Sequence, residues 1–156
     1  YRVSIMIEHN QKGMILLDNA CGMVSMMSSL SLNMYNHIIL MNQNQKLSSL
    51  FYEMMLSDMK YLHLFLQLSY HLGMEPRLWT CYCQHNEYWS PSYNNYPQSF
   101  DSLMDNVIES KKVLIDKFNL QLKSIHDPDI IKLLKSVIKE ENKYLTLLSS
   151  FINTDS

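Results

Sequence analysis

The repeat of apolar residues between Gln45 and Leu72 is the feature that most limits what this chain can fold into. Apolar and aromatic side chains recur at spacings of three and four residues, at Leu47, Phe51, Met54, Tyr61, Phe65, Leu68 and Leu72. This spacing places them along one face of an α-helix that is long enough to cross a small domain. A charged residue, Asp58, stands in the middle of the same face. The segment therefore predicts a core helix that carries a buried carboxylate.

Three further segments have the same helical period. The four predicted helices cover residues 16–42, 45–72, 98–123 and 129–152. Residues 73–97 contain three prolines and break the period, so the connections are short, long and short. This order predicts an all-α, antiparallel four-helix bundle with a long crossover between helices 2 and 3, which is the ferritin-like topology. We expect the crossover to pack on the outside of the bundle through its tryptophans and tyrosines.

The length of 156 residues suits one domain with a substantial core. We expect an N-terminal extension over residues 1–12, the bundle over 13–152 and a C-terminal tail over 153–156. The sequence begins at Tyr1, with neither an initiator Met nor a signal-peptide layout, so we expect it to lack the first residues of the natural chain. A net charge of −2 gives no reason to expect nucleic acid as a partner. No apolar run reaches the roughly 18 residues of a membrane span, so no membrane insertion is expected.

The three cysteines are expected to be reduced and structural, because an odd number without regular spacing is no disulfide framework. Cys81 and Cys83, with His85 nearby, could instead capture a metal, and an intermolecular disulfide is a further alternative. The twelve methionines are interpreted as core-filling and interface residues rather than soft-metal ligands.

Two more charged residues fall on apolar helix faces. Lys111 lies on the apolar face of the third segment, and Glu141 interrupts the stripe of the fourth. Together with Asp58 they predict three inward-pointing charges. Such charges are unfavourable in a protein core unless they are paired, bound to metal or neutralised.

Four stretches of the sequence resemble one family. Residues 88–96 read Tyr-Trp-Ser-Pro-Ser-Tyr-Asn-Asn-Tyr, close to that family's Tyr-Trp-x-Ala-Ser-Tyr-x-Asn-Tyr. The first-helix motif is similar at residues 22–30, and the other two stretches cover the second helix with its end and the fourth helix (53–77 and 131–144). On these motifs the chain resembles the rubrerythrin-related, ferritin-like proteins of clostridia and their relatives, over residues 13–152.

The resemblance implies a di-metal site of four carboxylates and two imidazoles in the family. At the six matching positions this chain has Met26, Asp58, Tyr61, Lys111, Glu141 and Tyr144. An alternative alignment places the family's third-helix carboxylate at Glu109, but helical periodicity puts Glu109 opposite the apolar face. A lysine in place of a bridging ligand would repel a divalent cation. We therefore expect no metal, no cofactor and no catalytic residues.

We hypothesise that Lys111 replaces the metal electrostatically. Its ammonium would pair with Asp58 and Glu141, and the hydroxyls of Tyr61 and Tyr144 would donate to the same carboxylates. The alternative is that some of these side chains reach solvent and that Met and Tyr fill the cavity.

These expectations favour a non-catalytic, structural ferritin-like protein that assembles with copies of itself, and not an enzyme. One alternative is a residual metal-binding redox protein, such as a ferroxidase or a peroxidase or catalase-like enzyme. Another is a regulatory pseudoenzyme that binds an active homologue. By the resemblance, we expect a bacterial, cytoplasmic protein with a sporulation-stage role.

Overall fold

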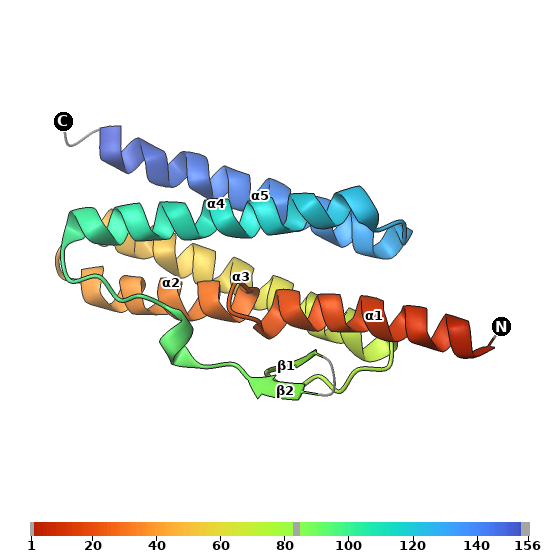
Figure 1. Ribbon diagram of the computed structural model, residues 1–156. Helices are drawn as coiled ribbons and strands as arrows, with labels where there is room; N and C mark the ends of the chain where they lie inside the picture. Colours follow the sequence, from red (N-terminus) through yellow and green to blue (C-terminus); the bar gives the residue numbers. More distant parts are fainter. Residues whose placement is uncertain (1, 83–84, 154–156) are drawn as a thin grey trace.

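Five α-helices and a short β-hairpin make up the computed structural model, which describes residues 2–82 and 85–153 (Figure 1). In chain order the elements are α1 (Arg2–Cys21), α2 (Met26–Leu40), α3 (Gln45–His71), β1 (Trp79–Tyr82), β2 (His85–Tyr88), a 3₁₀ turn η1 (Pro91–Tyr93), α4 (Phe100–Ser124) and α5 (Pro128–Asn153).

The five helices form a four-helix bundle, because α1 and α2 lie end to end and together occupy the first of its four helical positions, each called a rod below (Figure 1). The first rod consists of α1 and α2 and runs antiparallel to α3, while α4 runs antiparallel to α5 (Figure 1). The long crossover after α3 returns the chain to the other end of the bundle, so that α3 and α4 run in the same direction (Figure 1). The predicted all-α bundle with a long crossover between its second and third rods is confirmed.

The first rod bends at residues 22–25, so the prediction of one helix over 16–42 is wrong at this point. Ser25 caps α2, because its hydroxyl accepts a hydrogen bond from the backbone of Ser28 at 3.2 Å. Lys117 of α4 lies 2.7 Å from the carboxylate of Asp18 and donates to the carbonyl oxygen of Val24 at 2.5 Å. Lys117 therefore supplies a donor to a backbone carbonyl of the bend, which lies outside both helices.

Gly22 has a steric reason to stand at this bend. A Cβ at this position would collide with the carboxylate and the carbonyl group of Asp18. The Gly22 amide also donates to the Asp18 carbonyl at 2.8 Å. The bend therefore depends on close backbone approach as well as on the cap and the lysine.

The crossover contains a hairpin that periodicity did not reveal. Strands β1 and β2 pair antiparallel, with Trp79 opposite Tyr88. The crossover then docks on α2: the indole of Trp89 donates to the Ser28 hydroxyl at 3.0 Å, and the Asn94 amide donates to the Ser28 carbonyl at 2.9 Å. Tyr96 packs edge-on against Tyr35 of α2, with ring centroids 4.9 Å apart. The expected docking through aromatic side chains is confirmed for Trp89 and Tyr96.

The bundle core consists of two hydrophobic clusters. One contains Phe65, Leu114, Phe118, Leu134 and Val137, among others, and the second contains Phe51, Met54, Val107, Tyr144 and Leu148, among others. On each of α3, α4 and α5, one buried charged residue lies between the members of the two clusters. These residues are Asp58, Lys111 and Glu141. The bundle therefore has a polar layer between two apolar layers.

Neither predicted chain boundary coincides with a break in secondary structure. Helix α1 runs from Arg2 to Cys21, so it continues through the expected limit at residue 12. Helix α5 ends at Asn153, one residue beyond the expected end of the bundle. The limits 1–12, 13–152 and 153–156 stay predictions.

One stretch, Gln11–Leu40, is long and apolar enough to cross a membrane by length and composition, which corrects the expectation that none is. Of its most apolar window, 56% is buried inside the bundle. The bend at residues 22–25 also interrupts the helix within this stretch. Burial of this kind is typical of a core helix in a helical bundle.

Candidate functional site

The polar layer buries three ionisable side chains side by side. Asp58 is 1% exposed, Lys111 is 3% exposed and Glu141 is fully buried. Glu109, the alternative position for the third-helix residue, is exposed. The inward orientation predicted by the helical period is therefore confirmed for Asp58, Lys111 and Glu141. The alternative in which these three side chains reach solvent is wrong.

Lys111 forms an ion pair with Glu141 across α4 and α5. Its Nζ lies 2.5 Å from Glu141 Oε2, with both side chains almost fully buried. This is a charge-assisted hydrogen bond in a low-dielectric setting, where losing either partner typically costs about 3–5 kcal/mol. The second carboxylate oxygen, Glu141 Oε1, has no hydrogen-bond partner among the residues that the structure describes.

Asp58 is held in a different way. Its Oδ2 accepts hydrogen bonds from the Ser29 hydroxyl at 2.7 Å and from the Asn33 amide at 2.6 Å, both from α2. Burial raises the pKa of Asp58 well above its usual value of 3.8, and the charge of Glu141 raises this pKa further. The charge of Lys111 and the two hydrogen bonds oppose that rise in pKa. Asp58 is therefore stabilised in its neutral form.

Lys111 was expected to pair with both Asp58 and Glu141, and in the structure it pairs with Glu141. Among the ion pairs of the described residues, none joins Lys111 to Asp58. Lys111 affects Asp58 only through its charge. The reason is that Ser29 and Asn33 already supply Asp58 with donors from its own side of the bundle.

The two tyrosines do not donate to the buried carboxylates, which corrects the hypothesis. The Tyr61 hydroxyl lies 2.7 Å from the Ser136 hydroxyl, and the Tyr144 hydroxyl bonds to Glu140. Burial, followed by the charge of Glu140, raises the pKa of Tyr144 to about 12. The Tyr61 hydroxyl therefore reaches across from α3 to α5, and the Tyr144 hydroxyl meets a residue one turn earlier on its own helix.

Tyr144 still contacts the layer through its ring, whose centroid lies 5.7 Å from Lys111 Nζ. A cation near an aromatic face is stabilised by the ring quadrupole. Met26, the sixth matching position, is fully buried in the same apolar cluster as Tyr61 and Phe65. All six positions singled out from the sequence are therefore buried.

The side chains in this layer do not fit a pair of divalent cations. In the part of the chain that the structure describes, no group of three or more His, Cys, Asp and Glu side chains could hold a metal ion. The layer offers two carboxylates, one of them bonded to an ammonium and the other stabilised as a neutral acid. A di-metal centre of this fold type uses four carboxylates and two imidazoles.

Ser29 and Asn33 were missed as members of this layer. They lie four residues apart on α2 and point to the same partner. Asn33 falls on the buried face of that helix, so a buried amide opposite an expected buried carboxylate was a usable signal. Helical period does place Asn33 on the inward face of the first segment, but it does not show that the amide bonds to Asp58.

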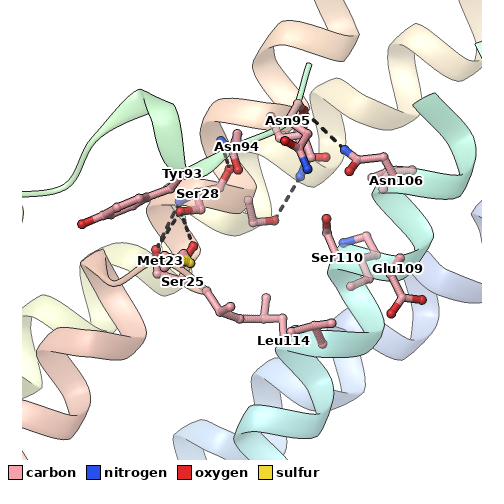
Figure 2. Close-up of a pocket in the computed structure, with 17 residues that line it drawn as sticks. Met23, Ser25, Ser28, Tyr93, Asn94, Asn95, Asn106, Glu109, Ser110 and Leu114 are labelled. Atoms are coloured by element: carbon pink, nitrogen blue, oxygen red, sulfur yellow. Dashed lines mark hydrogen bonds between the residues drawn. The ribbon is translucent and has the colours of Figure 1, made fainter. Parts of the chain in front are cut away.

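A pocket of about 280 Å³ opens beside the polar layer, between α2, the segment after β2 and α4 (Figure 2). Figure 2 shows Ser28 and Asn94 on one side of it, and Asn106, Ser110 and Leu114 of α4 on the other. The inner lining includes the side chains that hold the buried acids, namely Ser29, Asn33 and Lys111. Lys111 is therefore buried in the bundle and yet borders an open pocket.

The alternative metal site at the cysteines cannot be assembled from the described residues. Cys83 lies outside them, Cys81 is a free thiol at the hairpin, and His85 is exposed. The buried Cys21 is also a free thiol, and burial raises its pKa to about 12. The described cysteines agree with the expectation of free thiols.

Comparison with known proteins shows a likeness of fold. No protein-family model matches the chain, and no curated protein matches its sequence. The chain is similar to the crystal structure of wild-type KatB, a manganese catalase from Anabaena, with a TM-score of 0.80 and 12% identity. The match covers 94% of this chain and 73% of that chain. At this identity the likeness shows the fold alone, a ferritin-like helical bundle.

Proposed function

We propose that this chain is a non-catalytic ferritin-like protein in which a Lys111–Glu141 ion pair occupies the place of a di-metal centre. The observation that supports it most is the buried 2.5 Å contact between these two side chains. One ammonium inside the bundle neutralises one carboxylate, and burial favours the neutral form of the other by raising its pKa. The layer is then close to neutral overall without metal, which a buried set of charges requires.

The proposal gives the bundle a structural role, with a second copy of the same chain as its partner. On the outer face of α2, Met34, Ile38 and Met41 follow helical spacing and are 43%, 58% and 53% exposed. Helix α2 contains no Asp, Glu, Lys or Arg, so two copies can bring this face together without like-charge repulsion. Membership of the rubrerythrin-related family, a cytoplasmic location and a sporulation-stage role are part of the proposal and rest on the sequence resemblance.

The catalytic half of the proposal is tested by supplying iron or manganese during expression and purifying without chelators. We expect well under one equivalent of metal per chain, and no oxygen release from hydrogen peroxide above the buffer rate. A manganese catalase assayed in parallel serves as the positive control. Stoichiometric metal together with peroxide turnover would favour a residual redox enzyme instead.

The assembly half is tested by sedimentation of the wild type and of two matched variants. Ile38→Glu places a charge on the α2 face, and Leu120→Glu places the same charge on α4, where Leu120 is 63% exposed. We expect the wild type and Leu120→Glu to form oligomers and Ile38→Glu to be monomeric. A monomeric wild type at micromolar concentration would remove the self-assembly part of the proposal.

A further inference from the structure

We propose that Lys111 is a carbonyl-binding lysine, and that the pocket beside it admits a short, neutral hydroxyaldehyde which forms a reversible imine with its amine. This inference does not rest on the proposed structural function. It begins from the combination of burial and access at one residue. Lys111 is 3% exposed and yet lines the 280 Å³ pocket.

The hydrogen bonding of Lys111 is incomplete, unlike that of the other partly buried lysine on α4. Lys117 contacts the carboxylate of Asp18 and the carbonyl oxygens of Asp18 and Val24, which matches its three N–H donors. Within the described chain, Lys111 Nζ donates one hydrogen bond, to Glu141 Oε2. Two N–H donors of the Lys111 ammonium therefore have no hydrogen-bond partner among the described residues.

Glu141 can serve as the base that the amine needs. A buried ion pair can move its proton from nitrogen to oxygen without changing the net charge of the site, since both species stay in the same low-dielectric layer. Glu141 Oε2 lies 2.5 Å from the lysine nitrogen, within reach of that proton. Glu141 Oε1 has no hydrogen-bond partner among the described residues, so it remains free to accept a further donor.

The covalent step balances with groups that the site contains. The lone pair of the neutral amine attacks the carbonyl carbon, a C–N bond forms and the C=O π electrons pass to oxygen, which takes up a proton. After the attack the nitrogen releases one proton, and loss of the hydroxyl group as water, with the proton that Glu141 took from the ammonium, leaves a protonated C=N bond. Ser29 lines the pocket and is hydrogen-bonded to Asp58 at 2.7 Å, so it can pass protons between that carboxyl group and the departing oxygen.

The residues that line the pocket indicate which chemical class of ligand it accepts. Apolar side chains such as Leu32 and Leu114 share its wall with hydroxyl and amide groups that include Ser110 and Asn106. The cation of Lys111 is already paired, and Glu109 adds a carboxylate to the lining, so anionic compounds are disfavoured. The volume equals about nine waters at about 30 Å³ each, which suits a ligand of a few heavy atoms.

The test compares two lysines of the same native protein. The full chain is incubated with limiting glycolaldehyde and cyanoborohydride, which reduces any imine to a stable amine, and labelled lysines are located by peptide mass spectrometry. Lys112 is the internal control, because it is exposed and adjacent on α4. We expect Lys111 to be labelled at least ten times faster than Lys112. Labelling of Lys111 at or below the rate of Lys112 would overturn the proposal.

Two further measurements test whether the aldehyde reaches Lys111 through the pocket and whether the ligand must be neutral. Ser110→Trp narrows the pocket and is expected to reduce Lys111 labelling to the level of Lys112, whereas Ser124→Trp, at the exposed end of α4, leaves it unchanged. Glyoxylate is an aldehyde of the same length that carries a negative charge, and we expect it to show no preference for Lys111. Equal preference for both aldehydes would contradict the assignment to a neutral ligand, and an unchanged rate in Ser110→Trp would contradict the route. None of these outcomes depends on metal content or assembly.

Discussion

The two halves of the bundle each bury one carboxylate at the same level, and they stabilise it by different means. In the α2–α3 half, Asp58 is held by the neutral donors Ser29 and Asn33, and its pKa is raised by burial. In the α4–α5 half, Glu141 is held by the cation of Lys111 at 2.5 Å. Burial raises the pKa of the first acid and so favours its neutral form, whereas an ammonium lies beside the second. The difference shows that two acids buried at one level can be stabilised by different partners.

The largest expected effect comes from removing the cation. Lys111→Met leaves Glu141 buried without its partner, and we expect a loss of about 3–5 kcal/mol in the free energy of unfolding at pH 7. Urea denaturation followed by circular dichroism measures it. The variant Lys111→Met/Glu141→Leu is the control, since it removes both charges together and is expected to recover most of the loss. A loss below about 1 kcal/mol in the single variant would mean that the pair does not stabilise the fold.

Removing a neutral donor on the other side should have a smaller effect. Asn33→Leu removes one hydrogen bond to a neutral acid, with an expected loss of about 0.5–1.5 kcal/mol at pH 5. Hydrogen bonds to charged groups contribute about 1.5–3 kcal/mol, so the loss should grow if the pH is raised until Asp58 ionises. The same denaturation experiment at pH 5 and pH 8 measures the change. A loss of the larger size already at pH 5 would show that Asp58 is charged there, against its raised pKa.

Asp58→Asn should differ least from the wild type below the unfolded pKa of 3.8, and its pH dependence has a definite sign. Because the folded pKa of Asp58 is raised above its unfolded value of 3.8, its contribution is fully present below that value and is lost as pH rises through the folded pKa. The wild type should therefore lose stability relative to Asp58→Asn between pH 4 and pH 8. Thermal unfolding of both proteins over this range tests the sign. Stability of the wild type that rises relative to the variant would contradict it.

The tyrosine hydroxyls allow a finer test of which groups belong to the layer. Tyr61 and Tyr144 bond to Ser136 and Glu140 rather than to the buried carboxylates. Tyr61→Phe, which removes a bond between neutral groups, is expected to cost about 1 kcal/mol or less. Its pH dependence should equal that of the wild type. A change in the apparent titration of Asp58 in Tyr61→Phe would place the hydroxyl back in the carboxylate network.

The sequence predicted those parts of the site that follow from helical period alone. Asp58, Lys111 and Glu141 each stand on an apolar stripe, so their burial could be read from spacing. The bend at Gly22 could not be read from spacing in the same way, because part of its support, Lys117, comes from a helix about 95 residues later in the chain. The hydrogen-bond partners of Tyr61 and Tyr144 could not be predicted from the sequence either. The Tyr61 hydroxyl reaches Ser136 on another helix, and helical period carries no information about that distance. Glu140 lies four residues before Tyr144 on α5, so spacing allows their contact but does not select it over a buried carboxylate.

The most direct measurement of the central claim is thermal unfolding of metal-free protein with and without an excess of Mn²⁺ or Fe²⁺, the latter without oxygen. If the Lys111–Glu141 pair occupies the place of a metal centre, neither ion has a site to bind, and the midpoint temperature should stay the same. A specific site filled at one hundred times its Kd would add about 2.7 kcal/mol and raise the midpoint by about 5 °C or more. Such a rise, absent with Mg²⁺ as the control ion, would contradict the account.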